Sequence, residues 1–228
     1  MLNGSRFVRA SVIVLVHLLA VVLLARAWHA GPAWRVLAGV MAGYLVSDLL
    51  TLFVHWSLDN WFTPATPLIG GVVFYFRQHH AQPMAMFQRG FVENNFENAL
   101  LGLALELPPL LLGAGPMLSA LVGFMALWGA WVTTIHKAAH VERPARVARL
   151  LQRLHLLIDK PYHDVHHGGA ASHYGLVSGW CEPLVDALRV FELLEFVIVL
   201  LTGQIPVGPR LESTRGRARR LRAGGSAS

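Results

Sequence analysis

Histidine is the residue type in this sequence that could do chemistry most directly, because a neutral imidazole binds transition metals. Eight of the twelve histidines fall in four short groups. His136 and His140 are four residues apart, which places both rings on one face of a helix. The other groups are His55 alone, the pair His79-His80, and the set His163, His166 and His167. We interpret all eight as candidate metal ligands.

The number of these histidines favours two metal ions over one. A tetrahedral zinc ion takes three or four protein ligands, so eight nitrogens are too many for one such site. Two five- or six-coordinate ions would keep positions open for oxygen, which favours redox-active iron among the metals that imidazole suits. The single cysteine, Cys181, excludes an internal disulfide, an iron–sulfur cluster and a thiolate zinc finger. The alternative is a set of solvated histidines at a membrane interface.

Two aspartates share a helical face with His55. Asp48 stands seven residues before it and Asp59 four residues after it, and both spacings return to the same side of a helix. Asp48 lies in an apolar segment, where a carboxylate is costly. We predict that it accepts the second ring N–H of His55, as carboxylates often do beside metal-binding histidines. The alternative is a carboxyl group neutralised by Ser47, Tyr44 or a partner helix.

The remaining histidines carry weaker signals. His17, His29 and His155 are isolated, and we interpret them as packed or hydrogen-bonded residues. His173 is close to the last histidine group, where it could contact a backbone carbonyl, a lipid headgroup or the metal site. Glu106 lies in an apolar segment without a histidine in register, so it has no assigned role.

The composition indicates the surroundings in which these side chains are positioned. Of the 228 residues, 54% are hydrophobic and 14% are charged, whereas a soluble domain has about 25% charged residues. The net charge is +6, and most of it comes from six arginines after Pro209. These values exclude a water-soluble monomer and give no sign of nucleic-acid binding.

Four apolar stretches approach the length of about 20 residues that a helix needs to cross a bilayer. They cover residues 7–27, 34–54, 99–114 and 117–135. The first could instead be a signal peptide, because Ala25-Arg26-Ala27 has the small-x-small form, but its apolar run is long for one. The third is short, and Pro108-Pro109 is expected to break it.

Other segments are expected to lie on the membrane and not to cross it. Residues 68–76 are too few to span and indicate a re-entrant or interfacial piece. Residues 145–158 form a basic amphipathic pattern that suits anionic headgroups. Residues 184–201 carry charges on one helical face, as in a helix that caps a bundle. The composition of residues 209–228 predicts a basic disordered tail after a membrane-embedded domain of residues 1–208.

The distribution of Lys and Arg predicts the orientation of the spans. Basic residues gather after the second and fourth spans, whereas the turn 113–116 has none, so both termini are expected in the cytoplasm. This topology puts all four histidine groups on the cytoplasmic side. We therefore predict an all-α, multi-pass membrane protein with about four transmembrane helices and a cytoplasmic cap of amphipathic helices that carries a histidine-rich two-metal site.

Ordered motifs cover most of the chain, from about residue 43 to residue 206. They are Ser47-Asp48, His55-Trp56 with Asp59, Phe76-Arg77-Gln78-His79-His80, Phe91-Val92-Glu93-Asn94-Asn95 with Asn98, Ile135-His136-Lys137 with His140, His163-x-x-His166-His167, Ser178-Gly179-Trp180 and Leu201-Thr202-Gly203. In order and spacing they resemble the Kua/CarF-type lipid desaturase family, which includes plasmanylethanolamine desaturase and the plant plastid phosphatidylglycerol trans-3 desaturase.

The resemblance implies that the eight histidines hold two iron ions and that the chain uses O₂ to remove two hydrogens from a membrane phospholipid. The favoured reaction is vinyl-ether formation on an ether phospholipid such as plasmanylethanolamine, and acyl-chain desaturation is the next. Electrons would come from cytochrome b5 or ferredoxin with its reductase. The residues expected to support the metal site are Asp48, Asp59, Glu93, Asn95 and His173.

Departures from the family pattern bear on the substrate. Arg89-Gly90 replaces a His-Asp pair that is usual in ether-lipid members and is closer to the plastid type. Glu93, Asn95 and Asn98 instead follow the ether-lipid type. Two alternatives to a desaturase stay open: a lipid hydroxylase with the same metal site, and a non-enzymatic metal transporter or haem-binding bundle, for which paired ligands deep in the membrane are missing.

Overall fold

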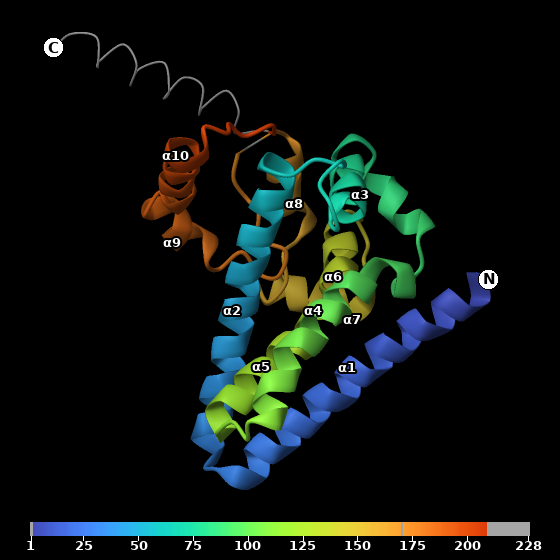
Figure 1. Ribbon diagram of the computed structural model, residues 1–228, viewed down its shortest axis with the longest axis vertical. Coiled ribbons are helices and arrows are strands. Elements are labelled where there is room, and N and C mark those ends of the chain that lie inside the picture. Colours follow the sequence, from blue (N-terminus) through green and yellow to red (C-terminus); the bar gives the residue numbers. More distant parts are fainter. Residues whose placement is uncertain (1, 170, 209–228) are drawn as a thin grey trace, which may run out of the picture.

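The computed structural model describes residues 2–169 and 171–208, and within them every regular element is a helix (Figure 1). The predicted tail, residues 209–228, lies outside the described residues. The elements are α1 (Leu2–Ala30), α2 (Ala33–Asn60), α3 (Gly70–Ala81), the 3-10 helix η1 (Pro83–Gln88), α4 (Phe91–Leu111), α5 (Pro116–Gly129), α6 (Val132–Ala139), α7 (Arg146–Arg153), α8 (Lys160–His167), α9 (Glu182–Ala187) and α10 (Val190–Thr202).

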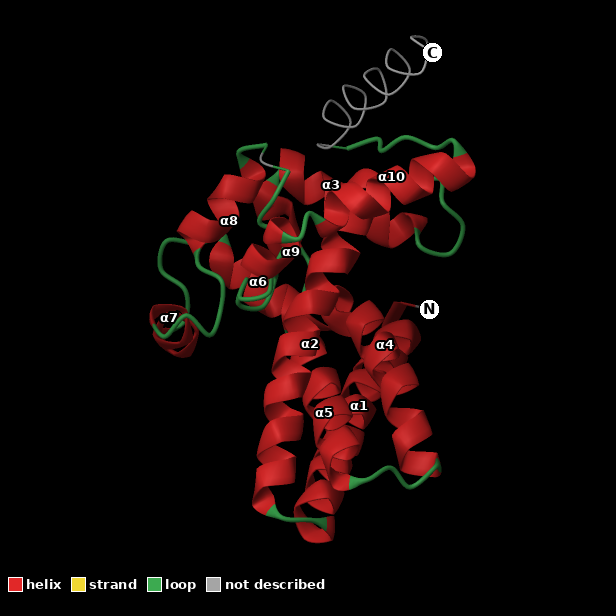
Figure 2. Cartoon of the chain, turned by 90° about the vertical axis from the view of Figure 1, so that its left-hand side faces the viewer, coloured by secondary structure: helices red, strands yellow, loops and turns green. Residues whose placement is uncertain are grey.

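Four helices, α1, α2, α4 and α5, pack side by side and form the long lower part of the molecule (Figures 1 and 2). α2 and α5 approach closely because glycines of α2 face the backbone of α5. A Cβ atom on Gly39 would lie 2.4 Å from the carbonyl oxygen of Met117, and one on Gly43 would lie 2.6 Å from that of Leu121. Small residues of this kind allow tight helix packing inside a membrane.

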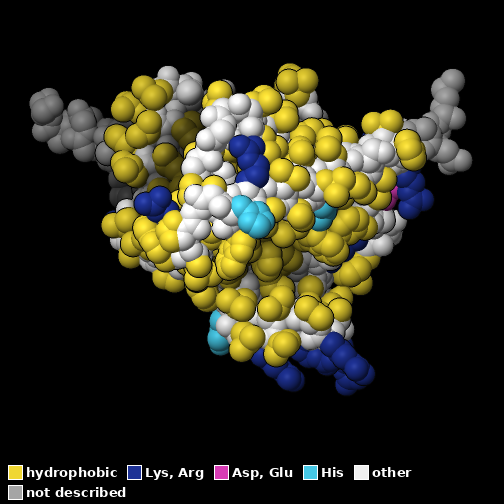
Figure 3. All heavy atoms as spheres, turned by 90° about the horizontal axis from the view of Figure 1, so that it is seen from below, with side chains coloured by type: hydrophobic (Ala, Val, Ile, Leu, Met, Phe, Trp, Pro, Cys, Tyr) yellow, Lys and Arg dark blue, Asp and Glu magenta, His cyan; other side chains and the backbone are white. Residues whose placement is uncertain are grey.

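The outer surface of this lower part is apolar. Val14, Leu18 and Leu37 are each more than half exposed. Figure 3, which views the molecule from below, shows hydrophobic side chains over most of that face. Such a large apolar surface is stable against lipid chains and not against water. We therefore describe the lower part as the membrane-embedded part.

The number of spans differs from the prediction of four. Ser5–Ala30 and Ala33–Asn60 are long and apolar enough to cross a membrane. Pro116–Gly129 and Val132–Ala139 add a third span if this pair, which is bent by 51°, is counted as one. α4 has 21 residues, but asparagines and glutamates in its first half make it more polar than these helices. The structure therefore supports two or three spans by length and composition, and the fourth is not confirmed.

Two helix breaks differ from the sequence prediction. The predicted break at Pro108-Pro109 is wrong, because both prolines lie within α4, which continues to Leu111. The prolines lack N–H groups, but their carbonyls still accept hydrogen bonds from the N–H groups of Leu112 and Ala114. The predicted span 117–135, in contrast, is interrupted after Gly129, where α5 ends and the chain turns into α6.

The helices α3 and α6–α10, together with η1, form a cap at the upper end of α2 (Figure 2). Residues 68–76, predicted as a re-entrant or interfacial piece, contribute to α3 in this cap. The basic amphipathic helix is shorter than predicted and ends at Arg153, because His155 adopts a left-handed conformation with φ of 55°. Leu157 and Ile158 then turn inward and are buried.

The segment 184–201 is also interrupted. Arg189 adopts a left-handed conformation, with φ of 53°, and separates α9 from α10. Its charged face is not uniformly solvated, because Glu195 is only 1% exposed. The predicted single capping helix is therefore two short helices, which pack against the upper end of α2 through a hydrophobic cluster.

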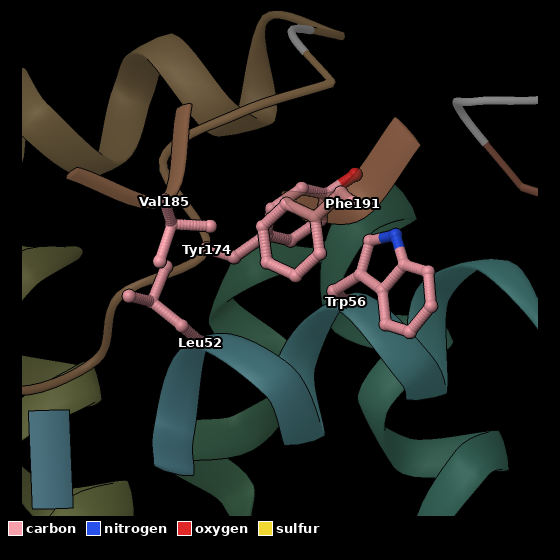
Figure 4. Close-up of a cluster of buried hydrophobic side chains, with 5 residues drawn as sticks. All are labelled: Leu52, Trp56, Tyr174, Val185 and Phe191. Atoms are coloured by element: carbon pink, nitrogen blue, oxygen red, sulfur yellow. The ribbon is translucent and has the colours of Figure 1, made fainter. Parts of the chain in front are cut away.

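This hydrophobic cluster joins the cap to α2 (Figure 4). Its buried members are Leu52, Trp56, Tyr174, Val185 and Phe191. The rings of Trp56 and Phe191 stack with centroids 5.0 Å apart, and Tyr174 meets Phe191 edge-on at 5.4 Å. Burial of these large aromatic side chains stabilises the contact. Because the Tyr174 ring is also 5.5 Å from the ring of His55, the cluster borders the histidines.

Candidate metal centre

The cap and the upper end of α2 bring all eight predicted histidines together. Their ligand atoms form two groups, each with all members within 4.8 Å of one another. The first group consists of His79, His136, His140, His163 and His167, and the second of His55, Asp59, His80 and His166. Adjacent histidines point to different groups, as side chains on neighbouring helical positions must. The adjacent pairs His79-His80 and His166-His167 therefore each serve both groups, whereas His136 and His140 both belong to the first.

Ring nitrogens in the first group form a tight triangle. The Nε2 atoms of His136 and His163 lie 2.8 Å apart. The corresponding distance is 3.0 Å between His140 and His163 and 3.2 Å between His136 and His140. An imidazole nitrogen lies about 2.1 Å from a zinc-sized cation, so two nitrogens at right angles around it are about 3.0 Å apart. The observed distances are those of donors around a single ion.

Asp59 lies at the centre of the second group. Its Oδ2 atom is 3.2 Å from Nε2 of His55 and 3.2 Å from Nε2 of His166, and its Oδ1 atom is 3.1 Å from Nε2 of His80. Asp59 is only 3% exposed, and His55 is fully buried. The sequence predicts Asp59 as a residue that supports the ligands, whereas the structure places its carboxylate among them.

Backbone carbonyls fix the orientation of three rings. Each ring donates a hydrogen bond from Nδ1: His55 to the carbonyl of Tyr174 (2.8 Å), His166 to that of Ser172 (2.9 Å), and His79 to that of Phe76. A carbonyl oxygen only accepts, so the ring proton is on Nδ1 and Nε2 carries the free lone pair. This arrangement is typical of histidines that bind metal through Nε2.

The residues fit a pair of metal ions. Nε2 of His55, Nε2 of His79 and Oδ2 of Asp59 are buried and have no hydrogen-bond partner among the described residues. An unsatisfied buried polar group costs about 1–3 kcal/mol, so three in one place call for a partner. Imidazole nitrogens and a carboxylate are suitable ligands for first-row transition metals. Two cations, one in each group, would satisfy all three atoms.

Burial keeps the imidazoles in the form that binds metal. It lowers the pKa of His79 and His163 well below the usual value for histidine, and neighbouring histidines lower these pKa values further. For His167, burial and the nearby His80 lower the pKa to about 3. Neutral imidazole is the ligand form, so these rings are ready to bind a cation at physiological pH.

The predicted hydrogen bond between Asp48 and His55 is wrong. The buried carboxylate of Asp48 instead accepts backbone N–H groups from Ser178 (2.8 Å), Gly179 (2.9 Å) and Cys181 (2.9 Å). Seven residues place Asp48 and His55 on one face of α2, but about 10.5 Å apart along its axis. This separation is too long for direct contact.

Replacing Asp48 with asparagine is expected to loosen the loop 171–181, which carries the carbonyls of Ser172 and Tyr174. An amide keeps one acceptor oxygen and turns an N–H group towards a backbone donor, and each lost charge-assisted bond costs about 1.5–3 kcal/mol. We expect Asp48→Asn to lower the melting temperature of the purified protein and its metal content. Glu142→Gln, which also replaces a carboxylate with an amide but at a side chain that is 84% exposed, should alter neither quantity, and wild-type values for Asp48→Asn would contradict this role.

Three other residues predicted to support the site lie outside both groups. Glu93 forms an ion pair with Arg6 at 3.3 Å. Asn95 is buried and donates hydrogen bonds to the carbonyl of α4 residue Phe91 and to a threonine of α6. The ring of His173 packs against that of Tyr162, with centroids 4.7 Å apart. These contacts are structural, and the prediction that the three residues touch the metal ligands is not supported.

The isolated histidines also lie outside the two groups. His17 is hydrogen-bonded, as predicted: its Nδ1 donates to the carbonyl of Ile13, and its Nε2 accepts from the indole of Trp131. His29 and His155 are exposed. The four-residue and adjacent spacings therefore distinguish seven of the eight clustered histidines from the isolated ones, whereas His55 has no such neighbour in sequence.

Sequence reasoning missed the loop between α8 and α9 as an orienting element. Its residues Ser172 and Tyr174 hold two histidine rings through backbone carbonyls. Glu182, which is 3% exposed, fixes this loop by accepting the N–H of Tyr174 at 3.1 Å and the hydroxyl of Tyr162. A backbone acceptor has no side-chain signal, so spacing could not have identified it.

A cavity of about 370 Å³ lies beside the first group, and His79 and His136 are part of its wall. Its apolar lining includes Leu50, Val54, Leu101, Leu105, Met125 and Trp128. Its polar lining includes Gln88, Arg89, Asn94 and Asn98. The polar residues lie where η1 joins the first half of α4, and the apolar residues of α4 lie in its second half, so the cavity suits an amphipathic ligand. Together these features define a helical membrane protein with a histidine-rich cluster compatible with a metal site, beside a largely apolar cavity.

Comparison with known proteins gives the family. A sequence model described as the lipid desaturase domain matches residues 44–208. Plasmanylethanolamine desaturase from Myxococcus xanthus is 31% identical over 91% of this chain and 77% of that protein. Plasmanylethanolamine desaturase 1 from Mus musculus is 32% identical over 84% of this chain and 73% of that protein. Chloroplastic fatty acid desaturase 4 from Arabidopsis thaliana is 31% identical over 72% of this chain and 52% of that protein.

The chain belongs to the lipid desaturase family. This finding confirms the resemblance that the order of the motifs indicates. No solved structure matches the chain.

Proposed function

We propose that this chain is an integral-membrane lipid desaturase that uses two iron ions and O₂ to introduce a double bond into a phospholipid chain. The observation that carries the proposal is the meeting of two groups of ligand atoms, the first of which contributes His79 and His136 to the wall of an apolar cavity. When bound, the iron pair would supply the oxidising power needed to remove two hydrogens from an unactivated carbon chain. The protein supplies binding, orientation and exclusion of water.

We assign one iron ion to each group of side chains. The eight histidines are the proposed ligands, and Asp59 joins the second group as a carboxylate ligand. The Nδ1 hydrogen bonds to backbone carbonyls hold the His55 and His166 rings with Nε2 towards the site. The role of Asp48 in this proposal is to hold the loop that provides those carbonyls.

The surrounding side chains exclude water from the reacting carbons. His55 and His163 are fully buried, and His136 and His166 are each 2% exposed. A dry site prevents side reactions of a strong oxidant. The apolar walls contributed by α2, α4 and α5 hold the lipid chain against His79 and His136, the two histidines that face the cavity.

The proposed substrate is an ether phospholipid such as plasmanylethanolamine, with vinyl-ether formation as the reaction. Two relatives whose names specify plasmanylethanolamine cover 91% and 84% of this chain, whereas the plant fatty acid desaturase covers 72%. Desaturation of an acyl chain is the second proposed reaction. The motif Arg89-Gly90, which resembles the plastid type, is the feature that favours it.

The proposed arrangement in the cell is a multi-pass membrane protein with its metal site on the cytoplasmic side. Residues 1–208 form the membrane-embedded catalytic domain and residues 209–228 a basic tail. Electrons would come from an acidic donor such as cytochrome b5 or ferredoxin with its reductase. The basic helix α7 carries Arg146, Arg149 and Arg153 on a surface suited to such a donor or to anionic lipid.

Lipid mass spectrometry tests the proposed reaction. Cells that lack ether-lipid desaturation are compared with and without this protein, under aerobic conditions. We expect a new phospholipid lighter by two hydrogens than its precursor and sensitive to mild acid, as vinyl ethers are. A product heavier by one oxygen would instead identify a lipid hydroxylase, and no change in any lipid would contradict the proposal.

The cavity predicts a dependence on chain length. Leu105 lines the apolar end of the cavity on α4, three residues beyond Gly102. Leu105→Trp adds volume there, so we expect conversion of long-chain substrates to fall more than that of short-chain ones. The matched control is Leu107→Trp, a change at an exposed position outside the cavity. Equal losses for all chain lengths would argue against this cavity as the chain site.

A further inference from the structure

Two cations, Arg89 and Lys137, meet where η1 joins α4. The Nζ atom of Lys137 donates to the carbonyl oxygen of Arg89 at 3.0 Å. The guanidinium of Arg89 lies over the ring of Tyr75, with 4.0 Å between Cζ and the ring centroid. Both Arg89 and Tyr75 line the cavity. The guanidinium of Arg89 therefore lies in the cavity wall, and the ammonium group of Lys137, which is not itself part of the lining, is held beside it through the Arg89 backbone.

No carboxylate neutralises these two cations within the part of the chain that the structure describes. The carboxylate of Glu93 pairs with Arg6 at 3.3 Å. Only the backbone carbonyl of Glu93 takes a hydrogen bond from Nη2 of Arg89, at 2.7 Å. Glu97 lines the same cavity as Arg89, but it forms no ion pair with either cation. Two adjacent positive charges that are half-buried and unpaired favour an anion.

The donors of both side chains are only partly used. A guanidinium has five N–H groups and an ammonium group three, whereas each of these side chains makes one hydrogen bond within the described residues. The carboxamide of Asn94 is already committed to the carbonyls of Met86 and Arg89. The remaining N–H groups of Arg89 and Lys137 are therefore the donors that can bind an anion here. A planar guanidinium is well suited to phosphate.

We propose that Arg89 and Lys137 bind the phosphate group of the phospholipid substrate at the polar end of the cavity. This inference rests on the proposed function, because it assigns the headgroup end of the same ligand. The apolar walls then receive the hydrocarbon chain, and the stacking of Arg89 on Tyr75 holds the guanidinium in place before the lipid enters.

The position of this anchor determines which carbons reach the site. Arg89, His79 and His136 line the same cavity. A phosphate held by Arg89 would thus lie in the same cavity as two proposed iron ligands. The carbons nearest the glycerol, and not the middle of the chain, would then lie beside His79 and His136.

The test measures lipid binding by the full-length protein, purified with its iron, separately from its activity. Native mass spectrometry quantifies the binding of an alkyl-acyl glycerophospholipid and of the matching alkyl-acyl glycerol, which lacks phosphate. We expect the wild type to favour the phospholipid and Arg89→Gln to reduce this preference about tenfold, as expected for a lost charge-assisted contact. Lys137→Gln should act in the same direction, and Arg143→Gln, a control at an exposed position before α7, should retain the wild-type preference.

Each outcome has a defined meaning. If Lys137→Gln loses iron because Lys137 is next to His136, the test of the phosphate anchor rests on Arg89→Gln alone. An unchanged preference in Arg89→Gln with normal iron content would overturn the anchor. Inorganic phosphate is the second probe. If phosphate binds the wild type in an Arg89-dependent way but the lipid preference does not depend on Arg89, then Arg89 and Lys137 bind a free anion and the lipid assignment is wrong.

The two proposals can fail independently. A wild-type protein that binds phospholipid through Arg89 but never changes it would support the anchor and contradict the desaturase. If the wild type and Arg89→Gln desaturate lipid at equal rates, at both limiting and saturating substrate, this result would contradict the anchor alone. A raised KM with a shifted double-bond position in Arg89→Gln would support the anchor.

Discussion

Replacing His136 or His166 with alanine is expected to abolish lipid conversion while the protein still inserts into membranes. His136 lies in the first group, 2.8 Å from His163 and 3.2 Å from His140 between Nε2 atoms. His166 lies in the second group, 3.2 Å from the carboxylate of Asp59. Each substitution therefore removes a donor from a different proposed ion. We expect a loss of at least about 100-fold, or about 2.7 kcal/mol of transition-state stabilisation.

The control for these variants is His29→Ala, which changes an exposed histidine outside both groups. Membrane insertion, monodispersity in detergent, iron content and lipid conversion are measured together for all three variants. We expect normal insertion throughout, reduced iron in His136→Ala and His166→Ala, and wild-type iron and activity in His29→Ala. Retained activity in both site variants would contradict the assignment of the histidines as ligands.

The second large effect is expected for Asp59→Asn. Asp59 is the carboxylate of the second group, and its two oxygens lie 3.1–3.2 Å from three histidine nitrogens. Asparagine has nearly the same shape but no negative charge, so it cannot offset the charge of a cation in a buried site. We expect the iron content to fall towards one ion per chain and activity to fall by at least about 100-fold.

Glu142→Gln is the matched control, because it also replaces a carboxylate with an amide. The Glu142 side chain is 84% exposed and lies outside both groups. It should leave iron content and activity at wild-type values. If Asp59→Asn keeps both iron ions and full activity, Asp59 is not a ligand, and the second group would have to hold its ion through histidines alone.

The convergence of the histidines could be predicted from sequence because their spacing reflects helix geometry. His136 and His140 lie one helical turn apart at the end of α6, and the adjacent pair His166-His167 divides between the two groups. The spacing also places Asp59 one turn after His55. Its proposed role as a ligand, and not only as a support, rests on its proximity to His80 of α3 and His166 of α8, which the local spacing does not predict.

The partner of Asp48 could not be predicted in the same way. Its carboxylate binds backbone N–H groups of residues 130 or more positions away in sequence, at Ser178, Gly179 and Cys181. Backbone donors cannot be identified from residue types. The position of Asp48 on one helical face therefore led to a prediction that it contacts His55, the nearest histidine on that face. The carbonyl of Tyr174 that orients His55 escaped prediction for the same reason.

The apolar segments were predictable in position but not in length. Hydropathy identified the first two spans, which the structure shows as Ser5–Ala30 and Ala33–Asn60. It did not reveal the 51° bend between α5 and α6 or the separation of α9 from α10 at Arg189. The separation at Arg189 places Phe191 at the start of α10, where its ring stacks on that of Trp56, a contact between residues far apart in sequence.

The most direct test of the central claim is iron analysis of the purified, active protein combined with lipid conversion before and after removal of iron. The five side chains of one group and the four of the other predict about two iron ions per chain. We expect chelation to stop conversion and added iron to restore it. Full conversion by protein that contains no iron would contradict the account.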